Sequence, residues 1–426
     1  MPSTQAPPKS TDVVVIGGGI IGCATAYYLS KQGVSVVLCE KGKIAGEQSS
    51  RNWGFIRKQG RDAAELPLMI HSLELWEALV PQMPDDVGFH RGGTLYLSDD
   101  EKRYESNQKW LALSKDFDLD TRFLGLSELS ALVPDLHGQT RGALFTASDA
   151  RAEPEKATLG IADLARKQGA KILENTAVRG IELCAGRVSG VVTESGPIAT
   201  STVVCAGGVW SSFFLRHLDL IFPQLKVIGS VMSTEPGPLV TQQSIWSNGL
   251  GMRRRSDGGY SIAYGGSFDC EVTPDHLRFF RQFIPAYKAG KEEVSLRFTT
   301  RFLTELVRST KPDFDKISPY ERERALNPAP NLKLLAQAKN KLSEVFPPLK
   351  DIKITNRWAG MIDATPDELP AICEVPSVPG LILSSGYSGH GFGIGPGAGK
   401  VTAELAMGSK PTVNLDAFKL ERLVRA

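Results

Sequence analysis

The segment of residues 11–42 constrains the fold of this chain more than any other part of it. Val13–Ile16 is a run of β-branched residues, as expected for a strand buried on both faces. A GxGxxG turn follows, then a helical stretch that ends at Gly33, and then a second strand, Val34–Cys39, that ends at Glu40. This order of strand, glycine turn, helix, strand and acid predicts a Rossmann-like α/β domain that binds a dinucleotide.

Each residue type in the motif has a physical role. Gly17 permits the tight turn, and Gly19 lets the backbone approach a pyrophosphate at the N-terminus of the helix. Gly22 lets the helix pack closely on the strand, and Glu40 is expected to accept a hydrogen bond from a ribose hydroxyl. The motif fits NAD and FAD equally, and its alternative interpretation is a glycine-rich turn without a ligand. Residues 41–62 favour FAD, because an NAD domain normally continues with another βα unit, whereas this segment is rich in glycine and polar residues.

Composition narrows the class of protein. A chain of 426 residues is too long for one core and predicts two domains. A formal net charge of +2 gives no field that argues for nucleic acid. The six cysteines are scattered, which argues against a metal site and a disulfide framework. Four of them lie in apolar runs and are expected in the core: Cys23, Cys39, Cys184 and Cys205. No run of about 18 apolar residues suggests a membrane span, and a cytoplasmic enzyme is the expectation.

Several segments together resemble one enzyme family. The stretch EKGKIAGEQSSR, beginning at Glu40, is similar to the D-amino-acid oxidase superfamily of FAD enzymes, and most of all to the bacterial L-amino-acid deaminases. ATSTVVCAGGVWSS, from Ala199, and NRWAGMIDATPDELPAI, from Asn356, extend the resemblance over most of the chain. The resemblance implies FAD contacts from Gly17, Gly19, Ile20, Gly22, Glu40, Lys41, Ser49, Ser50, Arg51, Gly54, Val178, Ala206, Gly207, Trp210, Gly360, Gly386, Gly389, His390, Gly391, Phe392 and Gly393.

The same resemblance implies a division into domains. A discontinuous FAD-binding domain is expected from residues 11–80, 151–215 and 350–412. Residues 81–150 and 216–349 are then expected to form a second, α+β substrate domain on a mixed β-sheet. The segment near 276–311 has apolar residues at helical spacing around AGKEE. It predicts a helical pair, either inserted near the active-site entrance or packed on the surface.

The glycine-rich segment SSGYSGHGFGIGPGAGK, Ser384–Lys400, lies close to the C-terminus. Backbone N–H groups can stabilise the negative charge of a reduced flavin only if side chains keep clear of the ring. We therefore expect a loop that approaches the flavin, followed by a helix from Lys400 to Met407. His390 is expected to orient the loop or the flavin rather than to act as a base, because hydride transfer from a neutral amine needs none. The alternative, a flexible linker, is disfavoured by the apolar segments on both sides.

The substrate carboxylate needs a fixed cation, and arginine suits it because its planar fork donates two parallel hydrogen bonds. Arg253, before an Asp-Gly-Gly turn, falls where the resemblance implies the carboxylate-binding arginine, although a solvated hairpin end is the plainer interpretation. Arg57 is the competing candidate. The remaining candidates are expected either to line the site or to pack in the core: Trp53, Trp358 and Tyr260.

Two departures from the family pattern concern the flavin. Gly360 occupies the position where sarcosine oxidases attach FAD through cysteine, so noncovalent FAD is expected. Gly393 replaces a lysine that assists oxygen, which leaves oxygen, a quinone or another carrier as the electron acceptor. The predicted activity is oxidation of an α-amino acid to its imino acid by hydride transfer from Cα to flavin N5, with keto acid and ammonia as final products. A secondary-amine dehydrogenase and a non-catalytic flavoprotein subunit remain alternatives, and an oligomer is left open.

Overall fold

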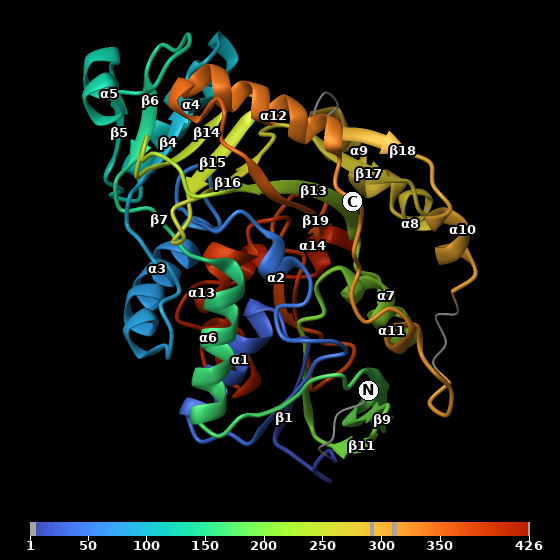
Figure 1. The fold of residues 1–426 in the computed structure, drawn as a ribbon. Coiled ribbons are helices and arrows are strands. Elements are labelled where there is room, and N and C mark those ends of the chain that lie inside the picture. Colours follow the sequence, from blue (N-terminus) through green and yellow to red (C-terminus); the bar gives the residue numbers. More distant parts are fainter. Residues whose placement is uncertain (1–5, 290–293, 309–312, 425–426) are drawn as a thin grey trace.

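A six-stranded sheet carries the predicted dinucleotide motif in the computed structural model, which describes residues 6–289, 294–308 and 313–424 (Figure 1). Its neighbours are parallel except for the first two strands. The order is β20 (Ala371–Glu374), β21 (Leu381–Ser385), β12 (Thr202–Cys205), β1 (Val13–Ile16), β2 (Val36–Cys39) and β8 (Lys171–Leu173). The Rossmann-like part of the prediction is confirmed.

Alternation along β1 explains why this sheet is covered on both faces. Val13 and Val15 point to a core formed with the helices α1 (Ile20–Lys31), α3 (Leu66–Leu79), α6 (Pro154–Lys167) and α13 (Gly391–Ala406). Val14 points to the opposite face and a second core. Because successive side chains of a strand face opposite sides, a continuous β-branched run supplies both cores.

The end of α1 agrees closely with the sequence. Gly33 follows the helix with a φ of +78°, a left-handed conformation that glycine adopts at little cost. The second strand begins at Val36, two residues after the predicted start. Cys23, Cys39 and Cys205 are buried as expected, whereas Cys184, at the end of β9 (Val178–Cys184), is exposed. The prediction for Cys184 is wrong because the last residues of β9 run out of the core into solvent.

A ten-stranded mixed sheet forms the other half of the described structure. Its pairings are antiparallel except for β14 with β4 and β17 with β18. β19 pairs with β13 from one end to the other. The strands are β18 (Val294–Arg297), β17 (Phe268–Glu271), β13 (Leu225–Thr234), β16 (Tyr260–Ala263), β15 (Leu250–Arg254), β14 (Ser244–Ser247), β4 (Thr94–Leu97), β6 (Ala143–Thr146), β5 (Thr121–Leu124) and β19 (Ile354–Ala364).

One helix covers the outer face of this sheet (Figure 1). α12 (Leu332–Val345) begins at Asn331, whose side chain accepts hydrogen bonds from two backbone N–H groups. Its apolar residues Leu335, Ala338, Leu342 and Val345 recur every three or four positions and are buried against the sheet. The mixed sheet expected for a second unit is therefore present.

The C-terminal part of the chain contributes strands to both large sheets. β19 lies in the ten-stranded sheet, while β20, β21 and α13 complete the six-stranded half. Two smaller sheets complete the fold, β9 with β10 (Arg187–Thr193) and β11 (Gly196–Ala199), and β3 (Phe55–Ile56) with β7 (Ala150–Arg151). The remaining α-helices outside residues 274–306 are α2 (Gln48–Arg51), α4 (Glu101–Lys115), α5 (Leu126–Leu132), α7 (Ser211–Leu215), α11 (Pro319–Arg322) and α14 (Glu421–Val424).

The segment near 276–311 departs from the predicted helical pair. It contains α8 (Pro274–Arg278), α9 (Phe280–Ala289) and α10 (Arg301–Leu306), with β18 between α9 and α10. β18 adds to the edge of the large sheet by pairing with β17 in parallel. Tertiary pairing at a free sheet edge thus overrides the helical spacing of its apolar residues. Residues 290–293 and 309–312 of the predicted pair lie outside the described residues.

The final glycine-rich segment also departs from its prediction, because α13 begins at Gly391 rather than at Lys400. A Cβ on Gly399 would lie 2.3 Å from the Cβ of Ala24, and one on Gly395 would lie 2.9 Å from Ile20. These glycines let α13 approach α1, so close packing stabilises a helix of low intrinsic propensity. Pro396 has no N–H to donate to the carbonyl of Phe392. Beside it, Ser72 of α3 accepts from the N–H of Gly397 and donates to the carbonyl of Gly393, which also accepts from Trp76.

In the part of the chain that the structure describes, we find no helix both long enough and apolar enough to cross a membrane.

Candidate active site

A cavity of about 310 Å³ lies where the two sheets meet. Residues at or just after the carboxyl ends of β1, β2, β12 and β21 line it, as do the first residues of α1 and α13. Gly360, Ile362 and Asp363 of β19 contribute from the large sheet. The carboxyl edge of a parallel sheet is where open α/β folds bind their ligands, so the topology places a binding site here.

The glycine turn forms one end of the cavity. Gly17 has a φ of +109°, and a Cβ there would lie 2.4 Å from the carbonyl oxygen of Ala206. A Cβ on Gly22 would lie 2.0 Å from the carbonyl oxygen of Gly17, so Gly22 serves helix packing and does not line the cavity. Gly19 is the N-cap of α1 and leaves the positive end of the helix dipole facing the cavity. This end can accept a pyrophosphate.

Glu40 lies buried beside this turn. Its two carboxylate oxygens accept hydrogen bonds from the backbone N–H groups of Gly18, at 2.7 Å, and Gly42, at 2.6 Å. Burial raises the pKa of Glu40, while these hydrogen bonds favour its charged form. Each carboxylate oxygen can accept a further bond, so Glu40 can hold a hydroxyl group in the cavity.

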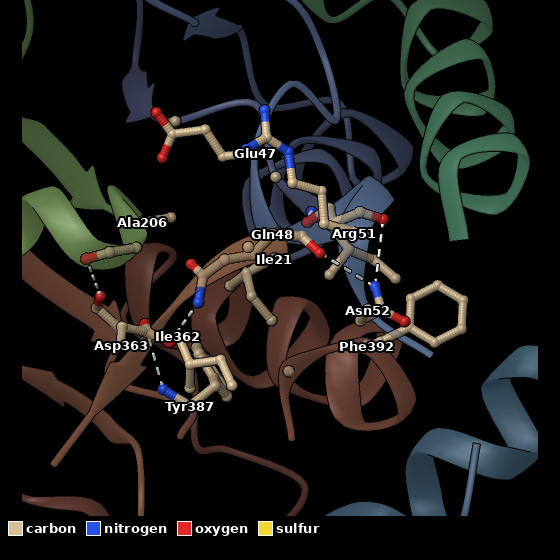
Figure 2. Close-up of a pocket in the computed structure, with 18 of the residues that line it drawn as sticks. Ile21, Glu47, Gln48, Arg51, Asn52, Ala206, Ile362, Asp363, Tyr387 and Phe392 are labelled. Atoms are coloured by element: carbon tan, nitrogen blue, oxygen red, sulfur yellow. Dashed lines mark hydrogen bonds between the residues drawn. The ribbon is translucent and has the colours of Figure 1, made fainter. Parts of the chain in front are cut away.

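The loop before α13 forms the opposite side of the cavity, and Asp363 fixes it to β19. The carboxylate of Asp363 accepts from the backbone N–H groups of Gly386, at 2.9 Å, and Tyr387, at 3.3 Å. Its other oxygen accepts from the side chain of Gln48 at 3.0 Å, as Figure 2 shows. The first turn of α13 has no side-chain cap, so its N–H groups remain available to an electron-rich atom in the cavity.

His390 lies at the start of α13 and faces a buried acid. Its Nδ1 is 3.1 Å from Oε2 of Glu65, which is fully buried. Burial and the nearby charge of Arg61 lower the pKa of His390 to about 4, so the ring is neutral at pH 7. With Glu65 ionised, Nδ1 carries the proton and donates to the carboxylate. The ring is thereby held in one orientation, and the role predicted for it, to orient the loop or the flavin, stays a prediction.

Arg57 and an aromatic wall form the substrate side of the cavity. The Arg57 guanidinium lies over the rings of Tyr96 and Trp246, at 5.5 and 5.7 Å from their centres. Trp53 stacks on Trp246 with ring centres 4.8 Å apart. Stacking on aromatic faces holds the planar guanidinium in place, so its remaining donors are oriented before a ligand binds.

The three other predicted substrate residues lie away from the cavity. Arg253 is 1% exposed and makes two hydrogen bonds with Glu153. The Tyr260 hydroxyl donates to the carbonyl of Pro238, and the Trp358 indole donates to the carbonyl of Arg51. None of the three lines the cavity. Arg57, Arg51 and Arg61 line the cavity instead, whereas the charge of Arg253 is already paired with Glu153.

Most residues predicted to contact the cofactor do line this cavity. Ser50 and Gly386 do not, although their neighbours do, and Gly22 packs behind the turn. A Cβ on Gly393 would lie 3.3 Å from the Cα of Ile56, so β3 fills the place of a side chain there. The lining residues from the prediction are Gly17, Gly19, Ile20, Glu40, Lys41, Ser49, Arg51, Gly54, Val178, Ala206, Gly207, Trp210, Gly360, Gly389, His390, Gly391, Phe392 and Gly393.

Several residues that line this site or contact its lining were not predicted from the sequence, among them Arg61, Glu65, Asp363 and Trp246. The first two follow Arg57 in a short charged run, which was a usable signal. The sequence next to Asp363 and Trp246 does not indicate a role for them, because their contacts in the site come from residues distant in the chain. Among residues 6–289, 294–308 and 313–424, no cluster of three metal-ligating side chains occurs.

Comparison with known proteins agrees with this geometry. Residues 12–405 match the model of the family described as FAD dependent oxidoreductase, DAO. The structure of an L-amino acid deaminase from Proteus myxofaciens in complex with anthranilate is 32% identical, covers 99% of this chain and 95% of its own, and superposes with a TM-score of 0.94.

Two curated relatives differ in length from each other. Glycine oxidase of Bacillus subtilis is 26% identical over 96% of this chain and 97% of its own length. Mitochondrial sarcosine dehydrogenase of Homo sapiens is 24% identical over 97% of this chain, which spans only 42% of that relative. The family match over nearly the whole described structure establishes that this chain belongs to the DAO family of FAD-dependent oxidoreductases.

Proposed function

We propose that this enzyme oxidises an α-amino acid to its imino acid with FAD, and that water then releases the keto acid and ammonia. FAD supplies an acceptor for the hydride that leaves the substrate Cα. The observation that carries the proposal is Arg57, a cavity arginine held by aromatic rings and without a carboxylate partner among the described residues. A substrate carboxylate is the ligand that its planar fork fits.

The cavity residues fit FAD. The α1 N-terminus and Gly17–Gly19 would hold the pyrophosphate, and Glu40 would accept from the ribose. The first turn of α13 would donate to the electron-rich end of the flavin. Gly360 offers no nucleophile, so FAD is proposed to bind noncovalently. Acid precipitation should then release yellow flavin into the supernatant, and colour kept in the pellet would contradict this.

The proposed role of Arg57 predicts a specific kinetic defect. Arg57→Met should lower kcat/KM by about thirty-fold to several thousand-fold, since truncating one partner of a buried charge pair costs about 2–5 kcal/mol. Arg57→Lys should recover part of the loss. The matched control is Arg254→Met, because Arg254 bonds to the carbonyls of Gly237 and Pro238 outside the cavity. Equal losses in Arg57→Met and Arg254→Met would remove Arg57 from the site.

Anaerobic mixing tests the activity itself. The holoenzyme is mixed with amino acids of both hands, and the loss of flavin absorbance is followed. Bleaching by at least one amino acid, and much less by its amide, is the expected result. No bleaching across the panel would refute an amino-acid-oxidising enzyme.

A secondary-amine substrate is the second candidate, favoured by the similarity to sarcosine dehydrogenase. Product analysis separates the two, because a primary α-amino acid releases ammonia while an N-methyl amino acid leaves a primary amine. For the electron acceptor, we propose that dyes or quinones reoxidise the flavin at least as well as oxygen, because Gly393 offers no cationic side chain there. Reoxidation far faster with oxygen in stopped flow would show a dedicated oxidase.

A further inference from the structure

Arg57 and Arg61 both line the cavity from the loop after β3. The buried Arg253, by contrast, is paired with the carboxylate of Glu153. Within the described ranges, neither loop arginine has a carboxylate oxygen within 4.0 Å. This loop therefore brings to the cavity two arginines whose charge the surrounding described residues do not pair directly.

Arg61 is the more deeply buried of the two and is 7% exposed. Its Nε donates to the carbonyl of Arg57 at 3.4 Å, while Nη1 is buried and has no acceptor among the described residues. Burial and the charge of Arg57 lower the pKa of Arg61 to about 10, so it stays charged at pH 7. A charged donor buried without an acceptor is strongly unfavourable, which points to an acceptor supplied by a ligand.

The acidic side chains near Arg57 and Arg61 bond to groups other than these two arginines. Glu65 is the acid that faces this corner, and its carboxylate is engaged by His390 rather than by either arginine. Behind the loop, Lys58 Nζ pairs with Asp120 at 3.8 Å, and Asp149 accepts from the backbone N–H groups of Lys58 and Gln59. The acids near the loop are therefore engaged by other groups, which leaves both arginines free to donate to the carboxylate of a ligand.

We propose that Arg61 is a second substrate-binding residue, and that Arg57 and Arg61 together hold one carboxylate. This inference rests on the proposed function, which assigns the carboxylate to Arg57. A carboxylate has two oxygens, and each can accept from one guanidinium. Arg61 approaches from the side of His390, where its charge acts on that ring, and Arg57 approaches from the aromatic wall. The pair selects substrates that carry a carboxylate at the reacting end.

Ligand binding tests this without turnover. The FAD-loaded protein is titrated with benzoate and with benzamide, and the change in flavin absorbance gives each Kd. Arg61→Met should raise the Kd of benzoate by about 10- to 150-fold, as expected for a lost charge-assisted hydrogen bond, and leave that of benzamide unchanged. Arg61→Lys should restore part of the affinity, and FAD content should equal that of the wild type. The matched control is Lys58→Met, a buried cation of the same loop that does not line the cavity.

The double variant Arg57→Met/Arg61→Met tests whether both residues hold the same group. A shared carboxylate predicts a smaller effect on benzoate affinity than the two single effects multiplied together. Wild-type benzoate affinity in Arg61→Met, or equal losses for benzoate and benzamide, would overturn the proposal. So would a defect seen only with the dicarboxylate phthalate, which would mean two separate anion sites. Benzoate binding requires no oxidation, so these results hold even if no amino acid reduces the flavin. A failure of the proposed oxidation can therefore be distinguished from a failure of carboxylate binding by Arg61.

Discussion

The guanidinium of Arg253 meets the carboxylate of Glu153 through two parallel hydrogen bonds of 2.9 Å each. The third nitrogen, Nε, donates to the backbone carbonyl of Trp53. Burial alone would raise the pKa of Glu153, but the hydrogen bonds and charge of Arg253 outweigh it and hold that pKa at about 2. The pair joins β15 of the large sheet to the residue before α6, so it connects the two halves of the fold.

Arg253→Met should therefore destabilise the fold and should leave the preference for an amino acid over its amide unchanged. Breaking a buried ion pair by removing one partner costs about 3–5 kcal/mol, because the other charge stays buried. Glu153→Gln should be destabilising as well, and the double variant should cost less than the sum of the two. Urea unfolding of the three variants measures this. If Arg253→Met has normal stability but no longer prefers an amino acid to its amide, Arg253 binds the substrate.

This pair also shows what the sequence could and could not predict. Strand alternation places Arg253 on one face of β15, but Glu153 is 100 positions away along the chain, and no local pattern pairs the two. The Rossmann-like core was predictable because strand, turn, helix and strand follow one another within residues 11–42 and each is coded locally. Arg57 lines the cavity and closely follows that core in the sequence, while its role in binding a substrate stays a prediction.

Glu40→Ala should weaken FAD binding by removing the acceptor beside the glycine turn. The variant also frees the backbone N–H groups of Gly18 and Gly42, which Glu40 now satisfies. The expected loss is about tenfold to a hundredfold in FAD affinity, equivalent to a hydrogen bond of about 1.5–3 kcal/mol to a charged group. Fluorescence titration of the apoprotein with FAD measures it, with the exposed Glu374→Ala as control. Unchanged affinity would remove Glu40 from the cofactor site.

For a Gly→Ala substitution in α13, helix propensity and close packing predict opposite changes in the free energy of unfolding. Gly→Ala inside a helix normally stabilises by about 0.5–1 kcal/mol. In Gly399→Ala, however, the new methyl group would lie 2.3 Å from the Cβ of Ala24, and overpacking of this kind costs about 1–3 kcal/mol. We expect a net loss in the free energy of unfolding. Gly160→Ala, inside α6, is the control, since the atoms nearest to its new methyl group belong to the flexible side chain of Met83. Stabilisation in Gly399→Ala would mean that the two helices separate at little cost.

Close packing of α13 against its neighbours also explains why the sequence prediction of its first residue was wrong. Glycine and proline at Gly393–Gly399 indicate a loop when only intrinsic propensity is considered. The helix forms because α1 and α3 pack against it, and because Ser72 and Trp76 donate to the carbonyl of Gly393 while Ser72 also accepts from the N–H of Gly397. Both neighbours are more than 300 positions away in the chain, so this stabilisation was not visible in the local sequence.

The neutral state of His390 predicts how stability depends on pH. Burial and Arg61 lower the pKa of His390 from 6.5 to about 4, so between these values the unfolded chain binds a proton that the folded chain does not. The free energy of unfolding therefore falls as the pH drops through this window, by up to about 3 kcal/mol from this residue. His390→Gln keeps a donor for Glu65 but removes the proton linkage, so its stability should fall less between pH 6.5 and 4. Urea unfolding across this range compares it with the wild type and with the exposed His137→Gln. Parallel curves for the wild type and His390→Gln would show that His390 titrates normally in the folded protein.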